Sequence, residues 1–217
     1  ADLAAACSIS AFTAAMHAGQ GCAITTRLVV PRARYDEAVG VAASMMSSIK
    51  PGDPTNPRTV CGPLISARQR DRVQSYLDLA LEEGGTFACG GVRPVGRDTG
   101  FFIEPTVIAG LTNEARVARE EIFGPVLTVI AHDGDDDAVR IANDSPYGLS
   151  GTVFSADSAR AAAVAARLRV GTVNVNGGVW YSADVPFGGY KQSGVGREMG
   201  VAGFEEYLEL KVIATAV

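Results

Sequence analysis

The chain has 217 residues, of which 47% are hydrophobic and 20% are charged, and its formal net charge is −5. Such a composition is typical of a globular protein, and the length allows a sizeable core without disulfides or metals. The acidic balance argues against nucleic acid or an anionic membrane as the main partner. The sequence contains no run of about 20 apolar residues and no signal peptide, so we expect no membrane partner.

Cysteine and histidine usage predicts a protein without a metal site. The four cysteines form no C-x-x-C pair, and the two histidines lie far apart without a ligand pattern. Four cysteines in a chain of this length do not build a disulfide scaffold, so we expect free thiols and a cytoplasmic location. The chain begins at Ala1 and enters a helical pattern at once, which leads us to expect a fragment or a processed product of a longer protein.

The first half of the chain alternates helical and strand-like patterns. Asp2 can cap the first helix, and Gly19 can end it. The stretch 50–63 holds four prolines and reads as a loop. Apolar periodicity and alanine content predict helices over 2–18, 34–49 and 66–83, and short apolar runs predict strands over 27–30, 86–89 and 101–108.

The second half continues this alternation. Strands are predicted over 126–131, 149–154 and 170–175, and helices over 135–142 and 158–168. Strand, helix and strand in this order predict an α/β fold, with an open, twisted, mostly parallel sheet that carries helices on both faces. Residues 207–217 read as an extended apolar segment, which is a candidate strand for pairing with another subunit.

A cysteine beside two glycines is the first motif that could take part in a chemical reaction. The sequence Gly19-Gln20-Gly21-Cys22 follows the first predicted helix. A catalytic thiol must be approachable, and glycines let the backbone turn tightly and come close to a substrate. Backbone N–H groups in such a turn can also face a developing oxyanion. Taken alone, a cysteine after a helix is more often a small core residue.

Two further motifs stand near the ends of predicted strands. The segment 120–125, EEIFGP, places a carboxylate and an aromatic ring next to a buried strand, where they could bind a ribose and stack on a flat ring. Alone, it reads better as a charged loop with an anchoring phenylalanine. The segment 186–198, PFGGYKQSGVGRE, contains a glycine pattern that mimics a dinucleotide fingerprint. Its spacing is G-x-G-x-x-x-G and no strand leads into it, so we reject it as a phosphate cradle.

Together, and in this order, these motifs resemble the aldehyde dehydrogenase superfamily, and the resemblance covers essentially the whole chain. Four other segments match the same family: 101–107 (FFIEPTV), 143–149 (NDSPYGL), 171–176 (GTVNVN) and 205–208 (EEYL). The resemblance implies a catalytic domain over 1–206 and an oligomerisation strand over 207–217. It also implies an assembly of identical subunits, a dimer or a tetramer.

The resemblance assigns roles to individual residues. Cys22 matches the nucleophile that attacks the aldehyde, with its own backbone N–H as one oxyanion donor. Glu121 matches the residue that binds the nicotinamide ribose, and Phe123 matches the ring that packs at the nicotinamide of NAD or NADP. The aldehyde tunnel is expected near Met16, Gly21, Ala23, Val179, Trp180 and Tyr181. The aromatic pair at 180–181 favours an apolar or aromatic aldehyde, and Cys7, Cys61 and Cys89 match no role.

The resemblance also implies that some catalytic residues and the main cofactor-binding domain of the family are missing from this sequence. In the family, the general base, the second oxyanion donor and the main cofactor-binding domain all precede the region that matches. We therefore expect no NAD-dependent oxidation of aldehydes by the chain alone. Three alternatives stay open: a non-catalytic truncated product that acts as an assembly module, an esterase activity of Cys22, and a CoA-acylating type.

Overall fold

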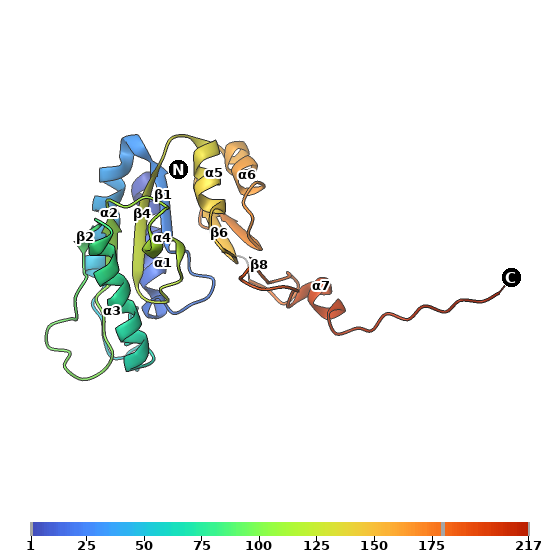
Figure 1. Cartoon of the computed structure of the whole chain (residues 1–217), viewed down its shortest axis with the longest axis horizontal. Helices are drawn as coiled ribbons and strands as arrows, with labels where there is room; N and C mark the ends of the chain where they lie inside the picture. Colours follow the sequence, from blue (N-terminus) through green and yellow to red (C-terminus); the bar gives the residue numbers. More distant parts are fainter. Residues whose placement is uncertain (1, 179–180, 217) are drawn as a thin grey trace.

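A four-stranded sheet lies at the centre of the larger part of the molecule (Figure 1). The structure is a computed structural model that describes residues 2–178 and 181–216. The strand order is β1 (Arg27–Pro31), β4 (Val126–His132), β3 (Thr106–Ala109) and β2 (Thr86–Cys89). β4 pairs in parallel with β1 and β3, whereas β2 is antiparallel to β3. The open, mostly parallel sheet predicted from the sequence is confirmed.

Helices cover this sheet on both faces. Val126, Leu127 and Val129 of β4 belong to the larger of two apolar clusters, and Ile130 belongs to the smaller one. Because alternate side chains of a strand point to opposite faces, Ile130 lies on the face opposite to Leu127 and Val129. The larger cluster includes residues of α1 (Leu3–Ala15), α2 (Tyr35–Ser48) and α3 (Ala67–Glu82), the smaller one includes a residue of α5 (Asp135–Asn143), and α4 (Arg116–Arg119) contributes to both.

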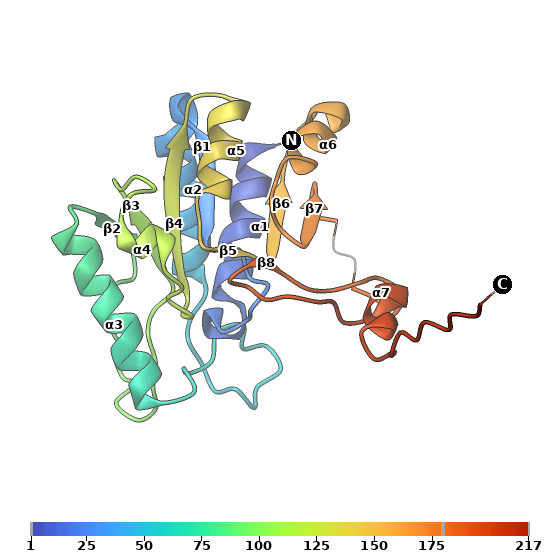
Figure 2. The same cartoon turned by 45° about the vertical axis from the view of Figure 1, so that its right-hand side comes forward.

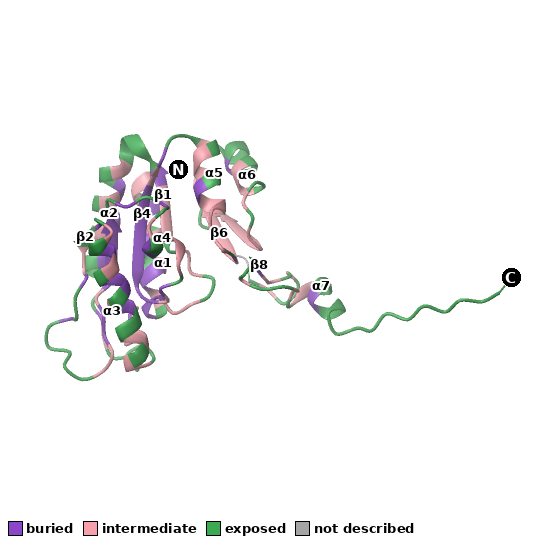
Figure 3. Cartoon of the chain, viewed as in Figure 1, coloured by how far each residue is buried: buried purple, intermediate pink, exposed green. Residues whose placement is uncertain are grey.

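Local sequence explains why the first helices form where they do. The Asp2 side chain accepts a hydrogen bond from the backbone of Ala4, and the Ser66 side chain accepts one from Gln69, so both α1 and α3 begin at capping residues. The buried face of α1 consists of alanines and Cys7, and these small side chains let α1 pack closely against α2. Buried residues accordingly gather on β4, α1 and α2 in Figure 3.

Two small sheets lie beside this body (Figure 2). β6 (Ser150–Val153) pairs in parallel with β7 (Thr172–Val175), and α6 (Ser158–Ala165) connects them. β5 (Tyr147–Gly148) pairs antiparallel with β8 (Tyr190–Lys191). The parallel strand–helix–strand unit predicted from the sequence is confirmed. Among the described residues, however, it forms a sheet of its own, and its strands are only half-buried.

Other expectations need adjustment at the ends of elements. The first helix ends at Ala15 rather than at residue 18, because His17 and Ala18 have φ values of 51° and 55°. α4, β8 and α7 (Gly200–Glu205) were not expected, since elements of four, two and six residues carry too little periodicity. Residues 208–216 have no assigned helix or strand and extend away from the body (Figure 1).

Candidate active site

A strained turn carries Cys22 to the surface. After α1, a 3-10 turn (Met16–Gly19) has three consecutive residues with positive φ: His17, Ala18 and Gly19. Non-glycine residues in this region cost about 1 kcal/mol or more each, so the surrounding structure must hold the turn. The Cys22 side chain is exposed.

The turn is held by packing against the segment 120–125. At Gly19, a Cβ atom would lie 1.9 Å from the carbonyl oxygen of Gly124 and 2.6 Å from the nitrogen of Pro125. Only glycine permits this approach, and its φ of 69° is a second reason for glycine at this position. The contact brings two motifs that are 100 residues apart in sequence to one place. It therefore puts the Cys22 turn beside the segment that holds Glu121 and Phe123.

Hydrogen bonds fix the turn on both sides of Cys22. The Gln20 side chain accepts a hydrogen bond of 3.1 Å from the backbone N–H of Ile65. The Ser150 hydroxyl, on β6, donates one of 2.7 Å to the carbonyl of Ala23. The backbone N–H of His17 donates to the carbonyl of Val60 at 3.2 Å. These partners come from two separate parts of the chain, the loop before α3 and strand β6, so the position of Cys22 depends on contacts that are distant in sequence.

The other cysteines lie in different environments. Cys7 and Cys61 are buried and Cys89 is half-buried, and all of them are free thiols. Burial raises the pKa of Cys61 to about 12 and also raises the pKa values of Cys7 and Cys89. A neutral thiol is a poor nucleophile, so these three are unsuited to catalysis.

The residues predicted to bind cofactor and substrate are partly brought together. Glu121 is exposed and Phe123 is half-buried, next to the Gly19 contact. Met16, Gly21 and Ala23 share the turn of Cys22. Tyr181 is 74% exposed and packs edge-to-face on Phe187, with ring centroids 5.9 Å apart. Val179 and Trp180 lie outside the described residues, so the predicted aldehyde tunnel stays a prediction.

The segment 186–198 is occupied by structural contacts. The Lys191 ammonium donates to the carbonyls of Asn143 and Ser145 at 2.7 and 3.0 Å. Burial, with the nearby guanidinium groups of Arg169 and Arg27, lowers the pKa of Lys191. The Arg197 guanidinium donates to two carbonyls of its own segment. These contacts give the segment's two basic side chains structural partners.

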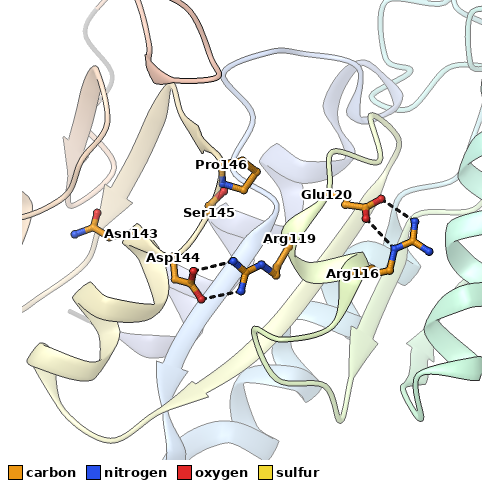
Figure 4. A pocket seen from close by; sticks show the side chains of 7 residues that line it. All are labelled: Arg116, Arg119, Glu120, Asn143, Asp144, Ser145 and Pro146. Carbon is orange, nitrogen blue, oxygen red and sulfur yellow. Dashed lines mark hydrogen bonds and ion pairs between the residues drawn. The ribbon is translucent and has the colours of Figure 1, made fainter.

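An open depression of about 540 Å³ lies away from Cys22, between α4 and the loop after α5 (Figure 4). Its charged side chains are already paired. Arg119 donates to both carboxylate oxygens of Asp144 at 2.9 Å, and Arg116 donates to Glu120 at 2.8 Å. Because these charged side chains are paired with one another and Cys22 is not among the lining residues, we do not place the active site there.

Two other kinds of site are absent from the described residues. Within 2–178 and 181–216, no group of three or more His, Cys, Asp or Glu side chains could hold a metal ion. In the same residues, no helix has the length and apolar character needed to cross a membrane.

Comparison with known proteins identifies the family. Residues 1–213 match the model of the aldehyde dehydrogenase family. A geranial dehydrogenase of Castellaniella defragrans is 44% identical over 215 residues, which is 98% of this chain and 44% of that protein. A betaine aldehyde dehydrogenase of Bacillus subtilis is also 44% identical, over 90% of this chain and 40% of that protein. The chain therefore belongs to the aldehyde dehydrogenase family, and it spans less than half the length of these relatives.

Solved structures agree with this result. The chain resembles a mutant aldehyde dehydrogenase C of Pseudomonas syringae in complex with NAD+ and octanal, with a TM-score of 0.93 and 45% identity over 96% of this chain and 43% of that one. It also resembles an aldehyde dehydrogenase of Mycobacterium tuberculosis in complex with NAD+, with a TM-score of 0.89 and 47% identity over 94% of this chain and 42% of that one. These relatives were solved with NAD+ bound.

Sequence reasoning missed the residues that hold the site in place. Gln20 and Ser150 act through single hydrogen bonds to distant backbone groups, and no spacing in the sequence indicates such partners. Gly19 was noticed only for its freedom in the turn, whereas its close approach to Gly124 is as important. The pair Gly19-Gln20 alone does not indicate that these residues contact distant parts of the chain.

Proposed function

We propose that the chain is the catalytic part of an NAD(P)-dependent aldehyde dehydrogenase, with Cys22 as its nucleophile. The observation that carries the proposal is the exposed Cys22 on a turn that packs against the segment of Glu121 and Phe123. Family membership supports it, as do relatives with NAD+ bound. In this assignment, residues 1–206 form the catalytic domain and residues 207–217 an oligomerisation strand.

The proposed chemistry begins at sulfur. The Cys22 thiolate forms a bond to the carbonyl carbon of the aldehyde, and the carbonyl oxygen takes the negative charge. The backbone N–H of Cys22 donates to that oxygen and lowers the energy of the transition state. NAD or NADP, when bound, would accept the hydride that leaves this carbon, so that its C–H bond breaks as the carbonyl group forms again. Cys22 then retains the acyl group as a thioester, and hydrolysis releases the carboxylic acid and frees the thiolate.

The described residues fit one end of the cofactor. The exposed carboxylate of Glu121 is suited to accept hydrogen bonds from ribose hydroxyls, and the half-buried ring of Phe123 offers a flat surface beside the Cys22 turn. The glycine pattern at 194–200 lies between β8 and the six-residue α7, without the strand that a dinucleotide fingerprint requires. We therefore expect the rest of the cofactor to be bound outside the described residues.

A chimera tests this function. The chain would be joined behind the remaining N-terminal part of the Pseudomonas syringae relative, and NAD-dependent oxidation of octanal would be measured. We expect activity in the chimera, none in the chain alone, and a loss of about 10³-fold or more in Cys22→Ser. Cys89→Ser is the matched control and should keep the activity. A folded chimera in which Cys22→Ser is as active as the parent would refute the proposal.

A non-catalytic assembly module is the second candidate. The observation that favours it is the exposed apolar tail, in which Leu210 is 99% and Val212 is 92% exposed. An assembly module would associate through this tail but would give an inactive chimera. The same measurement therefore separates the two candidates.

A further inference from the structure

One face of helix α3 forms hydrogen bonds to each residue of the segment 120–123. Gln69, Arg72 and Tyr76 are spaced by three and four residues, so they lie on the same side of the helix. The Tyr76 hydroxyl donates to the Glu120 carboxylate at 2.7 Å, and Arg72 donates to the carbonyl of Glu121. The order of contacts along the helix matches the order along the segment in reverse.

Gln69 makes the contact nearest to the proposed cofactor position. Its amide nitrogen donates to the carbonyl of Ile122 at 3.1 Å and to the carbonyl of Phe123 at 2.8 Å. Phe123 has a φ of 60°, a conformation that a non-glycine residue adopts only when its surroundings enforce it. Both amide hydrogens of Gln69 are thus used to hold the turn at Phe123.

The segment is held from two sides. At Gly124, a Cβ atom would lie 2.5 Å from the side chain of Val73, which is buried on the same helix. The Cys22 turn approaches the same glycine through Gly19. The segment therefore lies between α3 and the nucleophile turn, with its main chain fixed by both.

The pattern leaves the functional side chain of the segment free. Arg72 binds the main-chain carbonyl of Glu121, and among the described residues the Glu121 carboxylate takes part in no ion pair. If Arg72 served only to neutralise the charge of Glu121, it would pair with the Glu121 carboxylate. The hydrogen bond from Arg72 to the Glu121 carbonyl instead fixes the main chain of Glu121 and leaves its carboxylate available to a ligand.

We propose that Gln69, together with Arg72 and Tyr76, is a positioning residue that fixes Glu121 and Phe123 for the nicotinamide end of the cofactor. The inference rests on the proposed function, because it assigns a task to the same segment. Gln69 is not expected to touch reacting atoms. Its effect should be seen in cofactor binding and in the mobility of the segment.

The first test measures that mobility in the chain itself. Gln69→Met keeps the length and volume of the side chain but removes both N–H donors. We expect the amides of 120–124 to exchange hydrogen about tenfold faster in this variant, because two hydrogen bonds that hold the segment are lost. Gln74→Met is the matched control, since Gln74 lies on the same helix and its side chain donates to Asp78, one turn further along that helix. Equal exchange in both variants overturns the inference.

The second test measures the KM for NAD in the chimera. Gln69→Met should raise this KM about tenfold, with a change in kcat below about threefold, because the lost hydrogen bonds serve binding. Phe123→Ala, measured in parallel, tests the role of the segment. If Phe123→Ala raises the KM and Gln69→Met does not, the positioning inference alone fails. If neither variant changes the KM, the cofactor assignment of the segment fails and the inference fails with it.

Discussion

Exposure and burial divide the four cysteines into one reactive candidate and three structural residues. Cys22 is exposed, whereas burial raises the pKa values of Cys7, Cys61 and Cys89. Iodoacetamide reacts with thiolates, so at pH 8 we expect Cys22 to be alkylated at least about tenfold faster than the others. Peptide mass mapping over time measures the four rates. Equal rates in the folded chain would contradict the assignment of Cys22 as the accessible nucleophile.

Gly19 is the second residue on which the site depends. Gly19→Ala would place a Cβ atom 1.9 Å from the Gly124 carbonyl, in addition to the strain of a φ of 69°. We expect it to lower the free energy of unfolding by about 3 kcal/mol or more, since backbone must move to remove the clash. Urea titration followed by circular dichroism measures this change.

The control for Gly19 separates the clash from the strain. Gly96 has a similar φ of 72°, but a Cβ atom there would meet nothing within 4 Å. Gly96→Ala should therefore cost only the left-handed strain, about 1 kcal/mol. If the two variants lose the same free energy, the contact between Gly19 and Gly124 does not constrain the turn.

At the scale of elements, apolar runs bounded by turn residues were a good guide to the strands of the central sheet. The predicted strands at 27–30, 86–89 and 126–131 agree with the structure to within one residue, because each is a short apolar run bounded by turn residues. The strand predicted at 101–108 begins only at Thr106, where backbone pairing with β4 starts. Short elements, such as α4, could not be predicted because one turn of helix contains no repeat.

Within the site, the sequence identified candidate functional side chains but not the residues that hold them in place. Cys22, Glu121 and Phe123 belong to recognisable motifs, whereas Gln20, Gln69 and Ser150 act through backbone groups that are distant along the chain. Such contacts depend on how α3 and β6 pack, which no local pattern encodes. The roles of the first three residues still await the experiments proposed above.

Helix α5 begins with an acidic cluster that connects it to α6. This connection makes the free energy of unfolding depend on pH. Asp135 accepts a hydrogen bond of 2.7 Å from Arg160 on α6, and this contact lowers the pKa of Asp135 below its ordinary value of 3.8. A carboxyl group with a depressed pKa stabilises the fold above its unfolded pKa, and this contribution is lost as the pH falls through the folded pKa. The contact should therefore weaken in acid.

Urea titrations at pH 7, 5 and 3 can measure that loss. We expect Asp135→Asn to be less stable than the parent chain at pH 7 and at pH 5, and the difference to shrink at pH 3 because the parent carboxyl becomes protonated. Asp136→Asn is the control, since Asp136 pairs with Arg167 at 2.8 Å but its side chain is 94% exposed, so solvent screens this pair. A difference between parent and Asp135→Asn that stays constant from pH 7 to pH 3 would contradict the proposed linkage.

At the scale of the whole molecule, residues 2–206 hold the buried core, which stabilises the fold, whereas the tail, residues 207–217, is suited to contacts with other subunits. The body holds the buried core, whereas the segment after α7 extends into solvent with exposed apolar side chains (Figures 1 and 3). Leu210 is 99%, Val212 is 92% and Ile213 is 81% exposed. An extended apolar segment with free backbone groups is suited to add a strand to another sheet. This supports the proposal that residues 207–217 join identical subunits.

Deletion of residues 209–217 tests the tail. Because the exposed side chains contribute no buried area within one chain, we expect the Tm of dilute protein to change by less than about 2 °C. Sedimentation velocity at tens of micromolar should show dimers or tetramers for the full chain and monomers for the deletion variant. A double substitution, Leu210→Ser with Val212→Ser, should have the same effect without shortening the chain. If both variants assemble like the parent, subunit contacts lie elsewhere, and the tail is not the oligomerisation strand.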